Sequence, residues 1–333
     1  MVTVYDVAKA AGLSIASVSR ALNNQPGVSQ ATSQRVAHIA KEMGYEPNDV
    51  ARSLVGKSTR TIALLVPDIA NPFFPELVKS VQAKADENEH VLLLADGAGD
   101  RHRVAASMTV LRRKQVDGVI VVATALTVDA DELFVDIPTV FLDREGPRLG
   151  ASVVVNNEAA AFAATTHLID LGHRRIAHIA GPIDLEVSRQ RLAGWRRACS
   201  TAGLPSSDDL VVPGNFLEDG GYNVGTHITN PSSACTAVFA ANDLSAIGFL
   251  AYCADNHLSV PDDISVVGFD GIHLSRYTTP KLTTMAQPIV ELGRRAADVL
   301  FDLIRGEKSV PRIVLSATLL PGASVASPKA VLQ

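Results

Sequence analysis

The feature that most constrains the fold is a long alternation of short apolar runs and amphipathic stretches that begins at Thr61. Runs of strand length lie at 62–66, 91–95, 118–123, 139–142, 176–180, 237–240 and 266–269. Segments with apolar side chains at helical spacing lie at 74–89, 101–113, 158–171, 191–202, 244–256 and 290–305. Strands that alternate with helices form parallel sheets covered by helices on both faces. About 270 such residues exceed one doubly wound sheet, so we predict two α/β lobes.

Two such lobes also predict where a ligand binds. Ligands of doubly wound sheets bind beyond the carboxyl ends of the strands. These ends are expected to open into a cleft between the two lobes.

The first 45 residues follow a different, purely helical pattern. The first stretch repeats apolar side chains at helical spacing, which are Val4, Val7, Ala8 and Ala11. Thr3 suits the N-cap of this helix, Gly12 can take the left-handed conformation that ends it, and Ser14 can cap the next helix. A third helix is predicted at 32–43. Three helices in so few residues predict a compact, all-α head.

The second of these helices carries two distinct faces. Its apolar face consists of Val18, Ala21 and Leu22. The opposite face and its flanks consist of Ile15, Ala16, Ser17, Ser19, Arg20 and Asn23. Two short helices with a tight turn and an exposed second helix are typical of a helix-turn-helix, which places that second helix in the DNA major groove.

Residues 47–56 predict a short helix that forms only under certain conditions. Asn48 can cap it and Gly56 can end it, which gives about seven residues. Isolated helices below about 12 residues are marginal in water, so this segment is interpreted as a conditional hinge.

Charge and cysteine content set further limits. Residues 1–60 carry seven basic and four acidic side chains, a net charge of +3, while the whole chain carries −5 and the remainder therefore −8. This asymmetry confines affinity for phosphate to the N-terminal end. The three cysteines, Cys199, Cys235 and Cys253, lack metal-ligand spacing and are expected to be reduced. No metal site and no cofactor are predicted.

The sequence also favours a cytoplasmic location. Its longest apolar runs, such as 118–126, reach about half of the ~20 residues that a membrane span needs. The N-terminus lacks a basic segment followed by an apolar core, so no signal peptide is expected.

Seven segments in order carry a resemblance along nearly the whole chain. They are VTVYDVAKAAGLSIASVSRALN, YEPNDVARSLVGKSTRTIALLVPDIANPFF, KQVDGVIVV, LGHRRIAHIAGP, RLAGW, AVFAANDLSAIGFL and DISVVGFDGIHLSRYTTPKLTTMAQP. The series resembles the lactose-repressor/galactose-repressor (LacI/GalR) family of bacterial transcription regulators. This resemblance implies a homodimer that binds a near-palindromic operator in double-stranded DNA. It also implies a periplasmic-binding-protein-like body that holds a small effector.

The resemblance assigns DNA contacts to the head. Ile15, Ala16, Ser17 and Arg20 match the positions that read bases. Arg20 can pair with guanine O6 and N7, whereas Ile15 and Ala16 offer apolar contact to thymine methyl groups. The alternative is that Ile15 and Ala16 pack inside the head. The flanking Thr3, Ser14, Ser19 and Asn23 complete the predicted DNA-binding surface of the head.

The resemblance also assigns DNA contacts to the hinge. Residues 51–54 match the segment that the family inserts into the minor groove, and Ala51 and Leu54 are its predicted contacts. Leu54 would act as the apolar wedge that unstacks a base step and kinks the duplex. The alternative is a linker residue buried against the body.

The resemblance further implies a set of effector-binding residues. They are Phe73, Phe74, Asp143, Arg144, Arg191, Phe216, Asn242, Asp270 and Gln287. Aromatic faces can stack on a sugar or a base, and an Asp–Arg set makes strong, directional hydrogen bonds to hydroxyl groups. Each acid or arginine alone could instead form a surface ion pair or a bridge between the lobes. Leu185 and Val187 stand where purine-binding members carry arginine and threonine, so a sugar or a sugar phosphate is expected.

The expected domains follow. They are a DNA-binding domain at 1–46, a hinge and linker at 47–59, and an effector-binding and dimerisation domain at 60–333. The lobes of the last would comprise 60–157 with 285–316, and 158–284 with 317–330. Effector binding is expected to change the angle between the lobes and so the operator affinity of a cytoplasmic, nucleoid-associated repressor. Residues 325–333 offer no leucine heptads, so no tetramer is expected.

Two other classes of function compete with this hypothesis. An exported solute-binding protein would share the two-lobed body, but the helical head and the lack of a signal peptide disfavour it. An enzyme is disfavoured because the sequence lacks a Gly-x-Ser-x-Gly elbow, a phosphate-binding Gly-x-x-x-x-Gly-Lys-Ser/Thr loop and a His-Glu-x-x-His motif. No catalytic residue is predicted.

Overall fold

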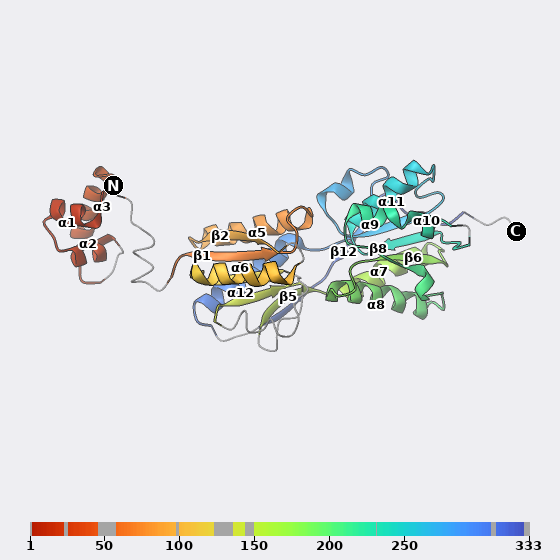
Figure 1. Ribbon diagram of the computed structural model, residues 1–333, viewed down its shortest axis with the longest axis horizontal. Coiled ribbons are helices and arrows are strands. Elements are labelled where there is room, and N and C mark those ends of the chain that lie inside the picture. Colours follow the sequence, from red (N-terminus) through yellow and green to blue (C-terminus); the bar gives the residue numbers. More distant parts are fainter. Residues whose placement is uncertain are drawn as a thin grey trace. The chain divides into compact units, whose positions relative to one another are not determined.

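The computed structural model describes residues 2–22, 26–45, 58–97, 100–122, 136–143, 150–230, 232–307 and 311–329. The chain divides into two compact units, Met1–Thr59 and Arg60–Gln333, here called the head and the body (Figure 1). Several predicted site residues lie outside the described residues: Asn23, Arg144, and the hinge residues Ala51 and Leu54.

The head consists of three helices around a small core. They are α1 (Val4–Ala11), α2 (Ile15–Leu22) and α3 (Gln30–Glu42). The core is formed by the small apolar side chains Val7, Ala8, Ala11, Val18, Ala21, Val36 and Ala40. The third helix begins two residues before the predicted start, because Ser29 caps it by accepting a hydrogen bond from the backbone N–H of Thr32 at 3.3 Å.

The turn between α1 and α2 uses the predicted residues. Thr3 is the N-cap of α1, and Oδ2 of Asp6 accepts from the Thr3 backbone N–H at 2.9 Å. Gly12 has a φ of 64°, the left-handed conformation that glycine adopts without strain. Ser14 accepts a hydrogen bond from the backbone N–H of Ser17 at 3.1 Å and so caps α2.

The first lobe of the body is built on a parallel, six-stranded sheet. Its strands are β1 (Thr61–Val66), β2 (Val91–Asp96), β3 (Gly118–Val122), β4 (Thr139–Leu142), β5 (Ala151–Val155) and β11 (Arg312–Leu315), in the order β11-β5-β4-β3-β1-β2. Helices α5 (Phe73–Glu87) and α12 (Ile289–Ile304) pack on one face. Helix α6 (Arg101–Arg113) packs on the other.

The second lobe repeats this arrangement with one exception. Its strands are β6 (Ile176–Ala180), β7 (Val211–Pro213), β8 (Ala237–Ala240), β9 (Ser265–Asp270), β10 (Thr283–Ala286) and β12 (Thr318–Leu320), in the order β12-β10-β9-β8-β6-β7. The edge strand β12 runs antiparallel to β10, whereas the other pairs are parallel, as predicted.

Helices again cover both faces of this sheet. One face carries α7 (Asn157–Asp170) and α8 (Glu186–Thr201), and the other carries α9 (Glu218–Asn223), α10 (Gly225–Ile228) and α11 (Asp243–Asp255). Two short 3₁₀ helices lie at Asp208–Leu210 and His273–Arg276. A helical head followed by a body of two parallel-sheet lobes is the predicted fold class.

The chain crosses between the two sheets more than once. It leaves the first sheet after β5, returns after β10, and crosses again between β11 and β12. The second sheet therefore continues to Ala286, beyond the boundary expected at 285, because β10 pairs with β9 up to Ala286. Among the described residues, no helix is long and apolar enough to cross a membrane.

Candidate functional site

The head presents a mixed apolar and polar surface on α2. Ile15 is 41% exposed, and Ala16 and Arg20 are also exposed, whereas Val18 and Ala21 on the opposite face are buried. Ile15 and Ala16 are therefore not part of the core of the head, which was the alternative considered from the sequence. Ser17 and Ser19 are half-buried at the flanks of this surface.

Two other residues of the head, one exposed and one in a structural contact, were not predicted to bind DNA. Tyr5 on α1 is 67% exposed, a large aromatic side chain that the sequence analysis did not select. Its position outside the apolar stripe of α1 is the signal that would have identified it. Arg35 on α3 has a structural contact instead, since its Nη2 donates to the Ala11 carbonyl at 3.0 Å and closes the end of α1.

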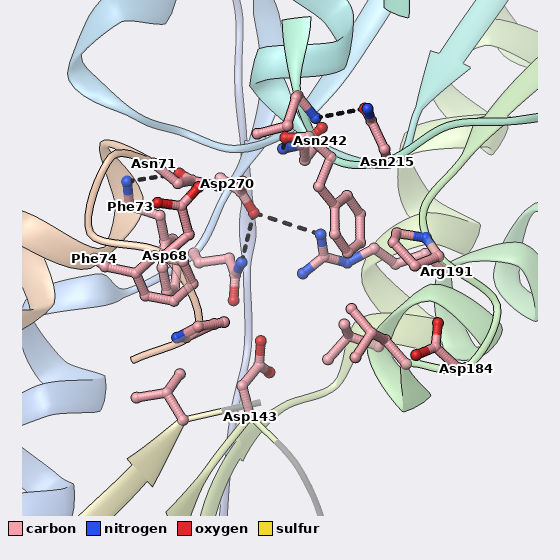
Figure 2. Close-up of a pocket in the computed structure, with 18 residues that line it drawn as sticks. Asp68, Asn71, Phe73, Phe74, Asp143, Asp184, Arg191, Asn215, Asn242 and Asp270 are labelled. Carbon is pink, nitrogen blue, oxygen red and sulfur yellow. Dashed lines mark hydrogen bonds and ion pairs between the residues drawn. The ribbon is translucent and has the colours of Figure 1, made fainter. Parts of the chain in front are cut away.

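The body contains a cavity of about 540 Å³ lined by residues of both lobes (Figure 2). Eight of the nine residues predicted for the effector lie in its lining: Phe73, Phe74, Asp143, Arg191, Phe216, Asn242, Asp270 and Gln287. Most of them follow the carboxyl end of a strand, where a doubly wound sheet places its ligand.

Arg191 is the central cation of the cavity, and only 3% of it is exposed. Its Nε donates to Oδ1 of Asn157 at 2.8 Å, and its Nη1 donates to the Ala241 carbonyl at 2.7 Å. The same Nη1 lies 3.5 Å from Oδ1 of Asp270. The guanidinium also stacks on Phe269, with Cζ 3.9 Å from the ring centroid. These contacts fix the guanidinium before a ligand arrives, which lowers the entropy cost of binding.

Asp270 faces Arg191 across the cavity (Figure 2). Its Oδ1 accepts a hydrogen bond from Nε2 of Gln287 at 2.7 Å. Burial raises the pKa of the Asp270 carboxyl to about 6, although Arg191 and Gln287 oppose this shift. In the described part of the chain, the buried Oε1 of Gln287 has no hydrogen-bond partner. A ligand hydroxyl group is the kind of donor that such an acceptor needs.

Asp143 points into the same space from the end of β4 (Figure 2). Its Oδ1 accepts a hydrogen bond from Nδ2 of Asn157 at 3.2 Å. Burial raises the pKa of the Asp143 carboxyl, and the positive charge of Arg191 opposes that shift. Asn157 thus holds both Asp143 and Arg191, although it is not among the residues predicted for the site. Only its place at the start of a helix after a buried strand could have drawn attention to it.

Aromatic rings form the apolar walls. Phe73 and Phe74, at the start of α5, meet edge to face with centroids 5.2 Å apart. Phe216 lies on the other lobe, with its ring centroid 5.7 Å from Cζ of Arg191. Asn242 supports this wall, because its Nδ2 donates to the Phe216 carbonyl at 2.9 Å while its Oδ1 caps α11.

Ten further described residues line the cavity and are not among the predicted ligand contacts. They are Pro67, Asp68, Asn71, Val122, Pro182, Asp184, Leu185, Val187, Asn215 and Leu217. Most lie in loops directly after β1, β6 and β7, so their position beyond strand ends was an available signal. Within the described residues, no three His, Cys, Asp or Glu side chains are grouped to hold a metal ion.

The comparisons with known proteins cover both units. Residues 3–48 match the family described as bacterial regulatory proteins, lacI family, and residues 165–325 match the periplasmic binding protein-like domain. The HTH-type transcriptional repressor PurR of Vibrio parahaemolyticus is 36% identical over 318 residues, which is 94% of this chain and 95% of the relative. The ribose operon repressor of Escherichia coli is 38% identical over 309 residues, 91% of this chain and 93% of the relative.

Solved structures agree with these relatives. The lac repressor dimer bound to operator and the anti-inducer ONPF has a TM-score of 0.87 at 28% identity, over 98% of this chain and 99% of that one. The transcriptional regulator CelR in complex with cellobiose has a TM-score of 0.74 at 32% identity, over 97% and 100%. The chain therefore belongs to the lacI family of bacterial regulatory proteins, and it is a DNA-binding transcriptional regulator rather than an enzyme.

Proposed function

We propose that this protein is a homodimeric repressor whose affinity for a near-palindromic operator is controlled by a carbohydrate bound in the cavity of the body. The observation that carries the proposal is the convergence of the predicted aromatic, carboxylate and arginine side chains on one cavity, in a chain whose head is a helix-turn-helix. The ribose operon repressor and the CelR–cellobiose complex are relatives whose names refer to carbohydrates.

On the DNA side, α2 supplies the base contacts. Arg20 reads a guanine, Ile15 and Ala16 contact thymine methyl groups, and Ser17 contributes a hydroxyl at the edge of this face. The remaining contacts come from Thr3, Ser14, Ser19 and Asn23 in the head, and from Ala51 and Leu54 in the hinge. Residues 1–46 form the DNA-binding domain and 47–59 the hinge and linker in this proposal.

The dimer is supported by apolar side chains at an open sheet edge. Strand β2 is the edge of the first sheet, and on it Val91 is 61% and Leu94 45% exposed. Val110 on the neighbouring α6 is 49% exposed. Large exposed apolar side chains beside the outer edge of a sheet are typical of a surface that a second copy covers. Two heads held together can bind two half-sites one DNA turn apart.

On the effector side, the cavity matches a polyhydroxyl ligand. The carboxylates of Asp143 and Asp270 and the amide oxygen of Gln287 accept hydrogen bonds, and Arg191 donates them. The rings of Phe73, Phe74 and Phe216 contact the apolar faces of a sugar ring. Since it acts on an operator, the repressor works in the cytoplasm and associates with the nucleoid.

The test is an operator titration with and without sugar. A binding site is first selected from a library of randomised DNA duplexes, and binding of the full chain is then followed by fluorescence anisotropy at two salt concentrations. Specific binding that weakens steeply with salt is expected, and D-ribose or another free sugar is expected to change the operator Kd. The absence of a selected site, or an operator Kd that no carbohydrate changes, would refute the proposal.

A further inference from the structure

The cavity carries an excess of negative charge. Among its described lining residues, Arg191 is the single cation, and four lining residues are aspartates: Asp68, Asp143, Asp184 and Asp270. Counting Arg144, which follows Asp143 in sequence but lies outside the described residues, the carboxyl groups still outnumber the guanidinium groups. Asp68, from the loop after β1, and Asp143 belong to the first lobe, whereas Asp184, from the loop before α8, and Asp270 belong to the second (Figure 2).

Arg191, the single cation among the described lining residues of the cavity, already donates hydrogen bonds to other parts of the protein. Nε and Nη1 of Arg191 donate to Asn157 and to the Ala241 carbonyl, and Nη1 also faces Asp270. A phosphate group in the cavity would therefore have to displace these contacts or accept from Nη2 alone. Sites that bind phosphate usually offer several free donors to one group.

In the described part of the body, three helices begin at the cavity, and two of them, α5 and α11, have N-terminal N–H groups that are already engaged, whereas α8 begins without a side-chain cap. The start of a helix attracts anions through its free backbone N–H groups. At α5 the N–H of Phe73 already donates to Oδ1 of Asn71 at 3.0 Å. At α11 the N–H of Ser245 donates to Oδ1 of Asn242 at 3.0 Å.

Acidic side chains also occupy the first turns of α5 and α8. They are Glu76 and Glu186, respectively. Each of these side chains is placed where it offsets the positive end of its own helix dipole. At the uncapped start of α8, the carboxylate of Glu186 therefore offsets the positive end of the helix, and a phosphate group would meet this negative charge as well.

We propose that the effector is a neutral, unphosphorylated carbohydrate, and that Asp68 and Asp184 exclude its phosphate ester. This inference rests on the proposed function and narrows it. A phosphate monoester carries a charge of about −1.5 to −2 at pH 7, which the aspartates repel, while the hydroxyl groups of a free sugar donate to those same carboxylates.

The experiment is isothermal titration calorimetry of the full chain with matched pairs. The pairs are D-ribose and D-ribose 5-phosphate, D-glucose and D-glucose 6-phosphate, and D-fructose and D-fructose 6-phosphate. The free sugar of the pair that binds is expected to bind at least about 100-fold more tightly than its ester at low salt. Higher ionic strength should reduce this ratio, because salt screens the exposed charge of Asp184.

Variants locate the origin of the selectivity. Asp68→Asn combined with Asp184→Asn is expected to reduce the ratio of the two Kd values about tenfold. Asp170→Asn is the control, because it removes the same charge from an exposed position that does not line the cavity, and it should leave the ratio unchanged.

The possible failures are distinguishable. An ester that binds as tightly as its free sugar overturns this inference and leaves the carbohydrate effector in place. Selectivity that persists in the double variant overturns the role of Asp68 and Asp184. If no member of any pair binds and no other carbohydrate changes the operator Kd, the carbohydrate effector itself is refuted and the inference falls with it.

Discussion

Two buried side chains in the second lobe respond to pH in opposite directions. Burial raises the pKa of Asp270 from 3.8 to about 6 and lowers the pKa of His178 from 6.5 to about 4. The native state holds the Asp270 proton more tightly than the unfolded chain does. The stability that this proton contributes is therefore present below pH 3.8 and is lost as the pH rises through about 6. The stability from neutral His178 is present above pH 6.5 and is lost as the pH falls through about 4.

These opposing contributions are expected to mask each other in the native protein and to appear in variants. Relative to the native protein, the free energy of unfolding of Asp270→Asn should change more favourably from pH 4 to 6.5, by up to about 3 kcal/mol. That of His178→Gln should change less favourably over the same range, by a similar amount. Urea unfolding followed by the fluorescence of Trp195, the single tryptophan of the chain, measures both. Trp195 stacks on His178, so its fluorescence reports on unfolding of the second lobe, which contains both titrating side chains. The same pH slope in both variants would contradict this assignment.

Arg20 differs from its neighbours on α2 because it alone among the described residues of that face carries a charge. Arg20→Ala is expected to weaken operator binding by about 5- to 150-fold and to relax selectivity at one base pair, because a bidentate contact to guanine is lost. Selection of sites by the variant from a random library measures the second effect. Arg113→Ala, an exposed position at the end of α6 in the body, is the matched control. If Arg20→Ala weakened binding to operator and to unrelated DNA by the same factor, Arg20 would contact the phosphate backbone and not a base.

At the scale of elements, α7 and α8 approach each other closely because Gly194 of α8 has no side chain at their contact. A Cβ on Gly194 of α8 would overlap the backbone oxygen of Glu158 and the methyl group of Ala161 in α7. Alanine normally stabilises a helix relative to glycine by about 1 kcal/mol. At position 194 alanine should instead destabilise the protein, because α8 has to move away from α7 to admit the methyl group.

Gly194→Ala is therefore expected to lower the free energy of unfolding by about 1–3 kcal/mol and to weaken sugar binding. The loss of affinity follows because Arg191 lies one turn earlier on the same helix and is held by Asn157 at the start of α7. Urea unfolding and calorimetry measure the two effects. Ala193→Gly, on the exposed side of α8, should cost only helix propensity and leave sugar affinity unchanged. A stabilised Gly194→Ala variant would show that the helices can separate freely.

Most elements with regular apolar spacing were predicted, but the buried apolar strand β5 and the short strands β7, β11 and β12 were not. Helix α6 spans the predicted residues 101–113. Helix α8 begins at Glu186, five residues before the predicted start, because its first turns carry mainly polar residues and its apolar periodicity starts later. Strand β10 was missed because its threonines do not resemble a buried strand. Thr284 is buried because its hydroxyl donates to Oδ1 of Asp243 at 2.6 Å, a partner 41 residues away.

In the cavity as well, some residues were predictable from the local sequence and others were not. Asp143 and Asp270 were predictable because each ends or directly follows a buried strand, and the family pattern places acids there. Asn157 acts through Asp143 and Arg191, which lie 14 and 34 residues away, so no local pattern in the sequence reveals it. Exposure on α2 likewise depended on packing in three dimensions, which separated Ile15 from the core of the head.

At the scale of the whole molecule, the proposed function requires that sugar and operator binding affect each other. The coupling is reciprocal by thermodynamics, and a coupling free energy of about 1–3 kcal/mol changes each affinity by about 5- to 150-fold. The cavity lies in the body and α2 in the head, so we propose that the coupling passes through the hinge, 47–59. A DNA contact made by the hinge should therefore affect the coupling free energy, whereas a base contact made by α2 should not.

Leu54→Ala and Arg20→Ala are both expected to weaken operator binding, but only the first should alter the coupling. Removing the proposed wedge makes hinge folding on DNA less favourable, so the ratio of operator Kd values with and without sugar should move toward one. Arg20→Ala removes a base contact and should leave that ratio at its native value. Anisotropy titrations at saturating and zero sugar give the ratio, and calorimetry without DNA should give a native sugar Kd for both variants. A native ratio in Leu54→Ala would show that the signal reaches the head without this side chain.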